Sequence, residues 1–288
     1  MFLPSVGAVV LAVMFVIGTI FLGNLNSGGE IEMVAQSQIN DLSELPVSAV
    51  EVEEEINFED MESQVKEVLK EYDADFGIGF KDLVTNISWG IDDDKVFTAA
   101  STMKVLAVSA LYDEVERGIL DLDKRIGGVE LREHARLALE VSDNNSWETI
   151  NNAVGYKDLQ KYASSLGLGD VDVFENRISA RDFRILLEKL YRGQLLNNEN
   201  TREILSFMDH TETENRIPAG LEDAEIIYHK TGTLDALTHD GAVVKSGNGD
   251  YILTVYTEYL DGDVDERSEV IARISNIVWD EYNLVMQN

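Results

Sequence analysis

The distribution of apolar and polar residues divides the chain into an N-terminal apolar run, an acidic stretch and a long patterned region. Residues 1–29 carry no charged side chain, and Phe2 to Leu22 is an almost unbroken apolar run. A run of this kind can cross a lipid bilayer as a helix of roughly 20 residues. We therefore predict a transmembrane anchor over residues 1–23. A cleavable signal is the alternative, although no basic residues precede the run and no clear Ala-x-Ala site follows it.

The next segment, residues 24–56, lacks aromatic side chains, is acidic from Glu30 onward and is interrupted by Pro46. Segments of this composition cannot bury enough apolar surface to offset the entropy lost on folding. We expect a disordered linker here, followed by one folded domain over residues 57–288. No internal repeat is visible in that domain.

Within residues 57–288, apolar positions recur either at helical spacing or in short runs typical of strands. The predicted helices are Met61–Tyr72, a helix from about Ala100 to Gly118, Leu137–Val141, Trp147–Val154, Leu159–Leu166, Phe183–Tyr191, Arg202–Met208 and Val264–Val285. The predicted strands are Phe76–Phe80, Asn86–Trp89, Ala224–His229, Gly241–Lys245 and Tyr251–Tyr256, with Ser246–Asp250 as a hairpin turn. Strands and a helix at both ends, with helices between them, predict an α/β (α+β) fold. Its antiparallel sheet is formed from both termini of the domain, with flanking helices and a helical insert beside it.

Composition excludes several classes of partner. The formal net charge is −31, which argues against DNA, RNA and anionic lipid headgroups because all of them carry the same sign. Solubility alone explains such a surface. The chain has no cysteine, so it forms neither a disulfide nor a thiolate metal site. Its 4 histidines show no pair at metal-ligand spacing. We predict no metal and no cofactor, and expect histidines on the surface or packed against strands.

Candidate chemistry begins at Ser101 and Lys104, which lie at the start of the predicted helix near Ala100 and share one of its faces. An amine held among apolar residues loses hydration, which lowers its pKa, and a neutral lysine can accept the proton of a neighbouring serine. A second Ser-x-x-Lys, Ser63 to Lys66, lies in a charged helix. Only Ser101 is followed by an apolar run, so only the first pair is expected to be desolvated.

Two short polar motifs follow in the chain. Ser142-Asp143-Asn144 lies between two helical stretches, and Lys230-Thr231-Gly232 ends a predicted strand. Each has an ordinary structural explanation, because the first also fits a helix N-cap and the second an edge strand that runs into a turn.

Taken together and in this order, Ser101-x-x-Lys104, Ser142-Asp143-Asn144 and Lys230-Thr231-Gly232 resemble the signature set of class A β-lactamases and penicillin-binding proteins. The similarity extends to neighbouring residues and spans about residues 60 to 285. It implies a β-lactamase/transpeptidase-like fold, and a serine hydrolase that acts on an amide bond through an acyl-enzyme.

The resemblance also implies roles for individual residues. Ser101 would be the nucleophile, Lys104 its base, and Ser142 the group that passes a proton to the leaving nitrogen. Lys230 would attract the substrate carboxylate and polarise Ser142. Substrate-binding residues would be Asn144, which holds the substrate's side-chain amide, and Thr231, Gly232 and Thr233, with the backbone N–H groups of Ser101 and Thr233 as the oxyanion hole.

One feature departs from the family pattern. In class A β-lactamases a loop after the helical insert carries a Glu that activates water to release the acyl group, but this chain lacks the Glu-x-x-Leu-Asn pattern there. Glu175, followed by Asn176, is the nearest substitute. Without that Glu, efficient release of the acyl group is not assured.

The resemblance therefore leaves three functions open. The first is hydrolysis of a β-lactam. The alternatives are a D-Ala-D-Ala carboxypeptidase or peptidoglycan amidase, and a non-catalytic penicillin-binding sensor. The partner would be a small β-lactam or a D-Ala-D-Ala peptide. Because the acidic stretch is better placed away from the anionic cytoplasmic leaflet, we expect a membrane-anchored, extracytoplasmic domain, or a secreted one if the N-terminal run is cleaved.

Overall fold

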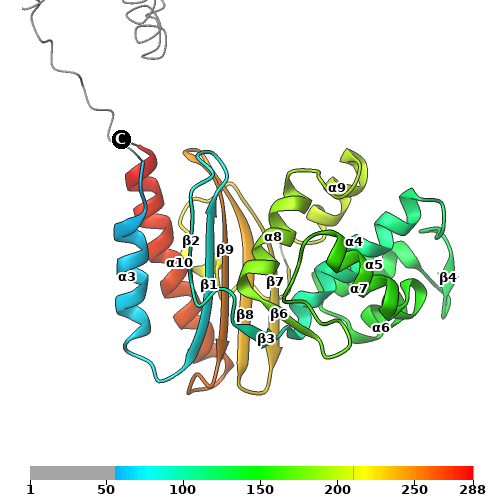
Figure 1. Cartoon of the computed structure of the whole chain (residues 1–288), viewed down its shortest axis with the longest axis horizontal. Helices are drawn as coiled ribbons and strands as arrows, with labels where there is room; N and C mark the ends of the chain where they lie inside the picture. The colour runs from blue at the N-terminus through cyan, green and yellow to red at the C-terminus, as the bar shows by residue number, and fades with distance from the viewer. Residues whose placement is uncertain (1–55, 210, 288) are drawn as a thin grey trace, which may run out of the picture. The chain divides into compact units, whose positions relative to one another are not determined.

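A computed structural model describes residues 56–209 and 211–287 (Figure 1). The predicted anchor over residues 1–23 and all but the last residue of the predicted linker lie outside these described residues. Within residues 56–209 and 211–287, no helix combines the length and apolar character that crossing a membrane requires.

A five-stranded antiparallel sheet forms the centre of the domain, with the strand order β2-β1-β9-β8-β7. The strands are β1 (Asp75–Asp82), β2 (Ser88–Ile91), β7 (Ile226–Leu234), β8 (Leu237–Ser246) and β9 (Gly249–Glu258). Strand β1, near the start of the domain, pairs with β9, near its end, with Ile78 opposite Val255. The predicted sheet assembled from both termini is therefore confirmed.

Two helices cover one face of the sheet, α3 (Glu59–Leu69) and α10 (Val264–Met286) (Figure 1). Helix α3 buries Met61, Val65 and Val68, which its spacing places on one side. Helix α10 is capped by Asp263, whose side chain accepts two backbone N–H groups in a capping box with Glu266. These two helices close one of the two hydrophobic cores.

The helical insert lies on the other face of the sheet (Figure 1). Its helices are α4 (Met103–Glu116), α5 (Leu131–Glu140), α6 (Asn144–Val154), α7 (Tyr156–Ser165), α8 (Ala180–Tyr191) and α9 (Asn198–Ser206). All residues of α4 from Met103 to Tyr112 are buried, so this helix is the centre of the insert. Helix α8 packs on the sheet, where a Cβ on Gly241 would meet the ring of Phe183 at 2.4 Å.

Short elements that the residue pattern did not predict complete the domain. They are the strands β3 (Val96–Thr98), β4 (Arg125–Ile126), β5 (Val129–Glu130) and β6 (Arg177–Ser179), and the 3₁₀ turns η1 (Ala100–Thr102) and η2 (Pro218–Gly220). Elements of two or three residues are too short to show a period. The prediction that Gly232 ends its strand was wrong, because β7 continues through Leu234, which pairs with Leu237.

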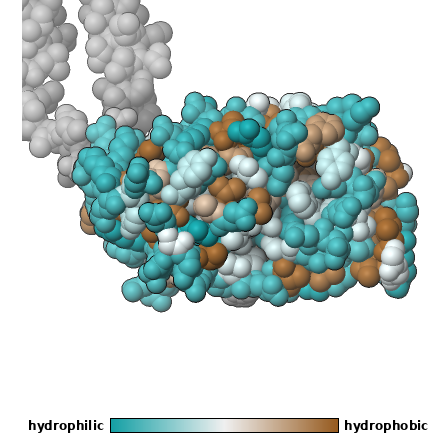
Figure 2. Space-filling model, turned by 90° about the horizontal axis from the view of Figure 1, so that it is seen from below, coloured by the Kyte–Doolittle hydropathy of each residue, from teal (hydrophilic) through white to brown (hydrophobic). Residues whose placement is uncertain are grey.

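The visible surface of the domain is mostly hydrophilic (Figure 2), as expected for a chain with many charged residues. Figure 2 shows one face, on which hydrophilic residues predominate and apolar residues lie scattered among them. Scattered exposed apolar side chains are ordinary on the surfaces of folded proteins.

Candidate active site

Ser101 lies in a turn between β3 and α4 that is held from three sides. Ala100, just before it, adopts a left-handed conformation with φ of 49°. The Ala99 N–H donates to the carbonyl oxygen of Asn176 at 2.7 Å, and the Thr102 hydroxyl donates to the Ala99 carbonyl at 2.7 Å. On the third side a Cβ on Gly232 would meet the Ala99 oxygen at 2.8 Å, so glycine is required for β7 to pack this closely.

Lys104 lies directly behind the serine and is fully buried. Its Nζ is 2.8 Å from Ser101 Oγ, 2.8 Å from Asn144 Oδ1 and 2.5 Å from the Ser142 carbonyl oxygen. Burial lowers the pKa of this amine to about 8, against an opposing effect of the nearby Asp143 carboxylate. Lys104 is therefore about half neutral near pH 8, with a lone pair available for the Ser101 proton.

Ser142 lies between α5 and α6 in a left-handed conformation with φ of 57°. Its hydroxyl oxygen accepts a hydrogen bond from Lys230 Nζ. The next residue, Asp143, caps α6 by accepting from the Ser146 N–H at 2.6 Å. The Ser-Asp-Asn motif thus provides both a helix cap and a hydroxyl directed at the site.

Lys230 lies on β7 and is 1% exposed. Burial, reinforced by the charge of Lys104, lowers its pKa to about 7, and the carboxylate of Asp240 opposes this effect. The positive charge of Lys104 disfavours a charge on Lys230. Both amines donate to Ser142, Lys104 to its carbonyl oxygen and Lys230 to its hydroxyl oxygen.

Arg216 is a residue that the motifs did not reveal. Its buried guanidinium donates to the carbonyl oxygens of Gly232 at 2.9 Å and His239 at 2.6 Å, and to the hydroxyl of Thr233. It therefore adds a second cation beneath the Lys230 end of the site. An arginine in a loop between helices and strands has no sequence signature, so nothing in the pattern indicated it.

The two histidines nearest the motifs are buried strand residues. His229 Nδ1 is 3.1 Å from Asp240 Oδ1, and the two carboxylates of Asp240 and Glu214 raise its pKa to about 9 despite burial. His239 Nε2 is 2.9 Å from the Thr98 carbonyl oxygen, and burial lowers the pKa of its ring to about 4. Both rings pack within the sheet region, as expected for strand-packing histidines. Among the described residues no group of three or more His, Cys, Asp or Glu could hold a metal ion.

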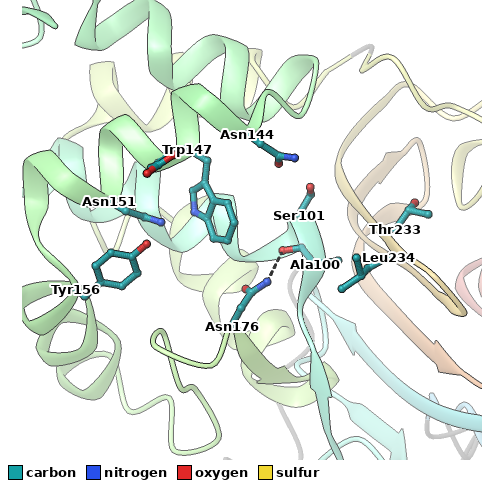
Figure 3. Close-up of a pocket in the computed structure, with 10 residues that line it drawn as sticks. Ala100, Ser101, Asn144, Trp147, Asn151, Tyr156, Asn176, Thr233 and Leu234 are labelled. Carbon is teal, nitrogen blue, oxygen red and sulfur yellow. Dashed lines mark hydrogen bonds between the residues drawn. The ribbon is translucent and has the colours of Figure 1, made fainter. Parts of the chain in front are cut away.

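A pocket of about 430 Å³ opens beside Ser101 (Figure 3). Its lining comes from the nucleophile turn, from α6, from the start of α7, from the loop before β6 and from the end of β7: Ala100, Ser101, Asn144, Trp147, Glu148, Asn151, Tyr156, Asn176, Thr233 and Leu234. The structure thus places Ser101, Asn144 and Thr233 around one cavity, with Lys104, Ser142 and Lys230 joined to them by hydrogen bonds. Thr231 is a buried β7 residue that precedes Gly232.

Glu175 is placed differently from the other candidates. Its side chain is exposed, its N–H donates to Asp172 Oδ1 at 3.0 Å, and it is not among the residues that line the pocket. The next residue, Asn176, lines the pocket instead and donates from Nδ2 to the Ala100 carbonyl oxygen at 3.3 Å (Figure 3). The role of Glu175 as a water-activating base stays a prediction.

Comparisons with known proteins agree with this arrangement. A family model described as "Beta-lactamase enzyme family" matches residues 60–282. The β-lactamase VEB-1 of Pseudomonas aeruginosa is 23% identical over 266 residues, which cover 76% of this chain and 89% of that protein. A β-lactamase of Proteus vulgaris is 25% identical over 266 residues, which cover 79% of this chain and 97% of the relative.

Solved structures of the same fold are also similar. A class A β-lactamase of the last common ancestor of Gram-negative bacteria superposes with a TM-score of 0.73 at 23% identity, covering 77% of this chain and 99% of the other. A point mutant of PBP-A, solved as an acyl-enzyme complex with penicillin G, gives a TM-score of 0.72 at 23% identity. That match covers 78% of this chain and 97% of PBP-A.

Proposed function

Because the chain belongs to the β-lactamase enzyme family, we propose that it is a serine hydrolase that opens the amide bond of a β-lactam through an acyl-enzyme on Ser101. The observation that carries this proposal is the distance of 2.8 Å between the buried Lys104 amine and Ser101 Oγ. A nucleophile and a base at hydrogen-bond distance, with the base further positioned by Asn144, are the minimum that acyl transfer requires.

Acylation follows from this geometry. Neutral Lys104 takes the proton of Ser101, and Ser101 Oγ attacks the β-lactam carbonyl carbon. The amide C–N bond then breaks, the nitrogen takes a proton from the Ser142 hydroxyl, and the hydrogen-bonded Lys230 ammonium can return a proton to Ser142. At the end of this step Ser101 carries an ester and the leaving nitrogen is a neutral amine.

The same groups account for binding of the carboxylate that such substrates carry. Lys230 and Arg216 bring two cationic side chains to β7, and the hydroxyl of Thr233, a pocket residue, is itself hydrogen-bonded to Arg216. In a domain of strongly negative formal charge, two buried cations near one strand create a local site for an anion.

The fate of the acyl-enzyme separates the candidate functions. Glu175 is exposed and outside the pocket lining, so hydrolysis of the ester is expected to be slow. This observation favours, as a second candidate, an enzyme that acts on D-Ala-D-Ala peptides or a sensor that stays acylated. If Glu175 does activate the water, Glu175→Gln should trap the acyl-enzyme, and an unchanged release rate would reject that role.

The experiment that tests the proposal is acylation by a labelled penicillin, followed by mass spectrometry of the digested protein. We expect an adduct on the peptide that contains Ser101, and none in Ser101→Ala. No adduct, or one that survives Ser101→Ala, would refute the proposal. Turnover of a chromogenic cephalosporin, set against release of D-Ala from a D-Ala-D-Ala peptide, then distinguishes the β-lactamase from the peptidase.

We also propose that the domain is held at the outer face of a membrane. The support is the uncharged sequence of residues 1–29 with its apolar run, which lies outside the described residues. The protein should then remain in the membrane fraction after alkaline carbonate extraction and be digested by protease added to intact cells. Release by carbonate, or protection from the protease, would contradict this proposal.

A further inference from the structure

The pocket beside Ser101 is much larger than the reacting groups need, and its extra volume runs along α6. Asn144, Trp147, Glu148 and Asn151 all line it, and their spacing places them on one face of that helix. With a rise of 1.5 Å per residue, Glu148 lies about 6 Å and Asn151 about 10 Å beyond Asn144 along the helix axis. In Figure 3 the Trp147 indole lies between Ser101 and the far residues Asn151 and Tyr156.

The pocket lining contains hydrogen-bonding atoms that the protein leaves unused, one of them in the part beyond Trp147. Asn151 is 3% exposed, and its Oδ1 has no hydrogen-bond partner. Asn176 Oδ1 and Trp147 Nε1, also in the pocket lining, are buried without a partner as well. Buried polar atoms without partners are costly, and a cavity lined by several of them is suited to a ligand that supplies the missing bonds.

Charge defines the chemistry of that ligand. Glu148 is the only carboxylate among the pocket-lining residues, and no ion pair joins it to any cation among the described residues. Because no hydrogen bond holds the side-chain amide of Asn151, that amide can turn to present its carbonyl oxygen. An ammonium group, with three donors and no acceptor, matches a carboxylate with a carbonyl oxygen one turn away. The ring of Tyr156 adds an aromatic face, which attracts cations.

We infer that the part of the pocket beyond Trp147 binds a primary ammonium group on the acyl substituent of the substrate, between Glu148 and Asn151. This inference rests on the proposed acylation of Ser101 and names the substrate class: acyl donors whose substituent carries a free amine. In an α-amino acyl side chain the amine lies five bonds from the reacting carbonyl carbon, about 6 Å away when extended. A substituent of this length carries its amine beyond the reacting groups, and Glu148 lies about 6 Å beyond Asn144 along α6.

The test compares acylation rates of Ser101 for three penicillins that differ only at one carbon of a phenylacetyl side chain. Ampicillin carries an amino group there, benzylpenicillin a hydrogen and carbenicillin a carboxylate. We expect the second-order rate constant to be about threefold to fivefold higher for ampicillin than for benzylpenicillin at low ionic strength, the range of a solvent-accessible ion pair. The advantage should shrink as salt is added.

Two kinds of variant distinguish the effect of the Glu148 carboxylate on the acylation rates from the effect of the domain's overall negative charge. Glu148→Gln should bring the ampicillin-to-benzylpenicillin ratio close to one, and Glu148→Lys should favour carbenicillin. The matched control is Glu269→Gln, which removes the same charge from an exposed position on α10, the helix that covers the opposite face of the sheet. That variant should keep the wild-type ratio.

Three outcomes overturn the inference, and they are distinguishable. If benzylpenicillin acylates Ser101 but the ratio is the same in the wild type, Glu148→Gln and Glu269→Gln, the ammonium site is wrong and the proposed function stands. If none of the three penicillins acylates Ser101, the proposed function fails and the inference fails with it. A wild-type preference for carbenicillin would also contradict the ammonium site.

Discussion

The chain contains the same four-residue pattern twice, and the two copies have different surroundings. Ser63 and Lys66 lie on α3, where both side chains are exposed and the Lys66 amine pairs with Glu62 at 2.5 Å. Ser101 and Lys104 lie at the start of α4, where the lysine is fully buried and its amine contacts the serine hydroxyl. Identical spacing thus gives a solvated ion pair in one place and a nucleophile with its base in the other. The two copies differ in hydration: the Lys104 amine is shielded from water, whereas the Lys66 amine is exposed to it.

The largest predicted effect is on the rate of Ser101 acylation when one of the two lysines is replaced. Lys104→Met should lower the rate of Ser101 acylation by about a thousandfold, since removing a positioned base typically costs about 10²–10⁴. Lys66→Met should leave that rate within about twofold, because an exposed side chain on α3 has no contact with the site. Stopped-flow acylation by a labelled penicillin measures both. Similar losses in both variants would mean that burial does not distinguish the two copies.

The next largest effect concerns the close packing of the Ser101 turn on β7. Gly232→Ala should slow acylation by about a hundredfold, because the new Cβ must displace the Ala99 carbonyl and a shift of about 1 Å at a reacting group can cost that much. The control is Gly247→Ala, in the hairpin turn between β8 and β9, where nothing lies within 4 Å of an added Cβ. If Gly232→Ala acylates like the wild type, the turn does not depend on this contact.

The pH dependence should reflect the two buried lysines. Acylation requires neutral Lys104, whose fraction rises as pH increases through about 8, and protonated Lys230, whose fraction falls as pH increases through about 7. The product of these fractions is largest between the two values. We therefore expect a bell-shaped profile for the second-order acylation rate, with about a tenfold loss per pH unit on each side, and apparent pKa values that belong to the coupled pair. A flat profile from about pH 6 to 9 would contradict this assignment.

The smallest effect is expected at the solvated copy. Glu62→Gln removes the ion pair of Lys66, which is exposed on the surface of α3, and should change the free energy of unfolding by less than about 0.5 kcal/mol. Denaturation in urea measures this difference. A loss of several kcal/mol would show that the α3 pair is a structural element rather than a solvated one.

The sequence predicted those helices and strands that are long enough to show a regular spacing of apolar residues. Helices α3, α4 and α10 and the hairpin of β8 and β9 belong to this class, as does the pairing of both ends of the domain in one sheet. The three motifs also indicated Ser101, Lys104, Ser142 and Lys230, which the structure joins by hydrogen bonds.

Other parts of the site depend on contacts between distant segments and could not be predicted. Arg216 reaches the site through the carbonyl oxygens of β7 and β8, which any residue type supplies. Which of two neighbours, Glu175 or Asn176, faces the pocket depends on the backbone, and Asn176 has a left-handed φ of 52°. The short pair β3 and β6, which brings that loop beside the Ser101 turn, has only three residues in each strand.

The central statement, that the amine of Lys104 is dehydrated and partly neutral beside Ser101, can be tested by NMR titration of the protein with labelled lysine. The Lys104 signal is identified by its loss in Lys104→Met. We predict that this signal titrates with an apparent pKa of about 8, the value that burial imposes. Titration near about 10.4, the value of a lysine in water, would contradict the account.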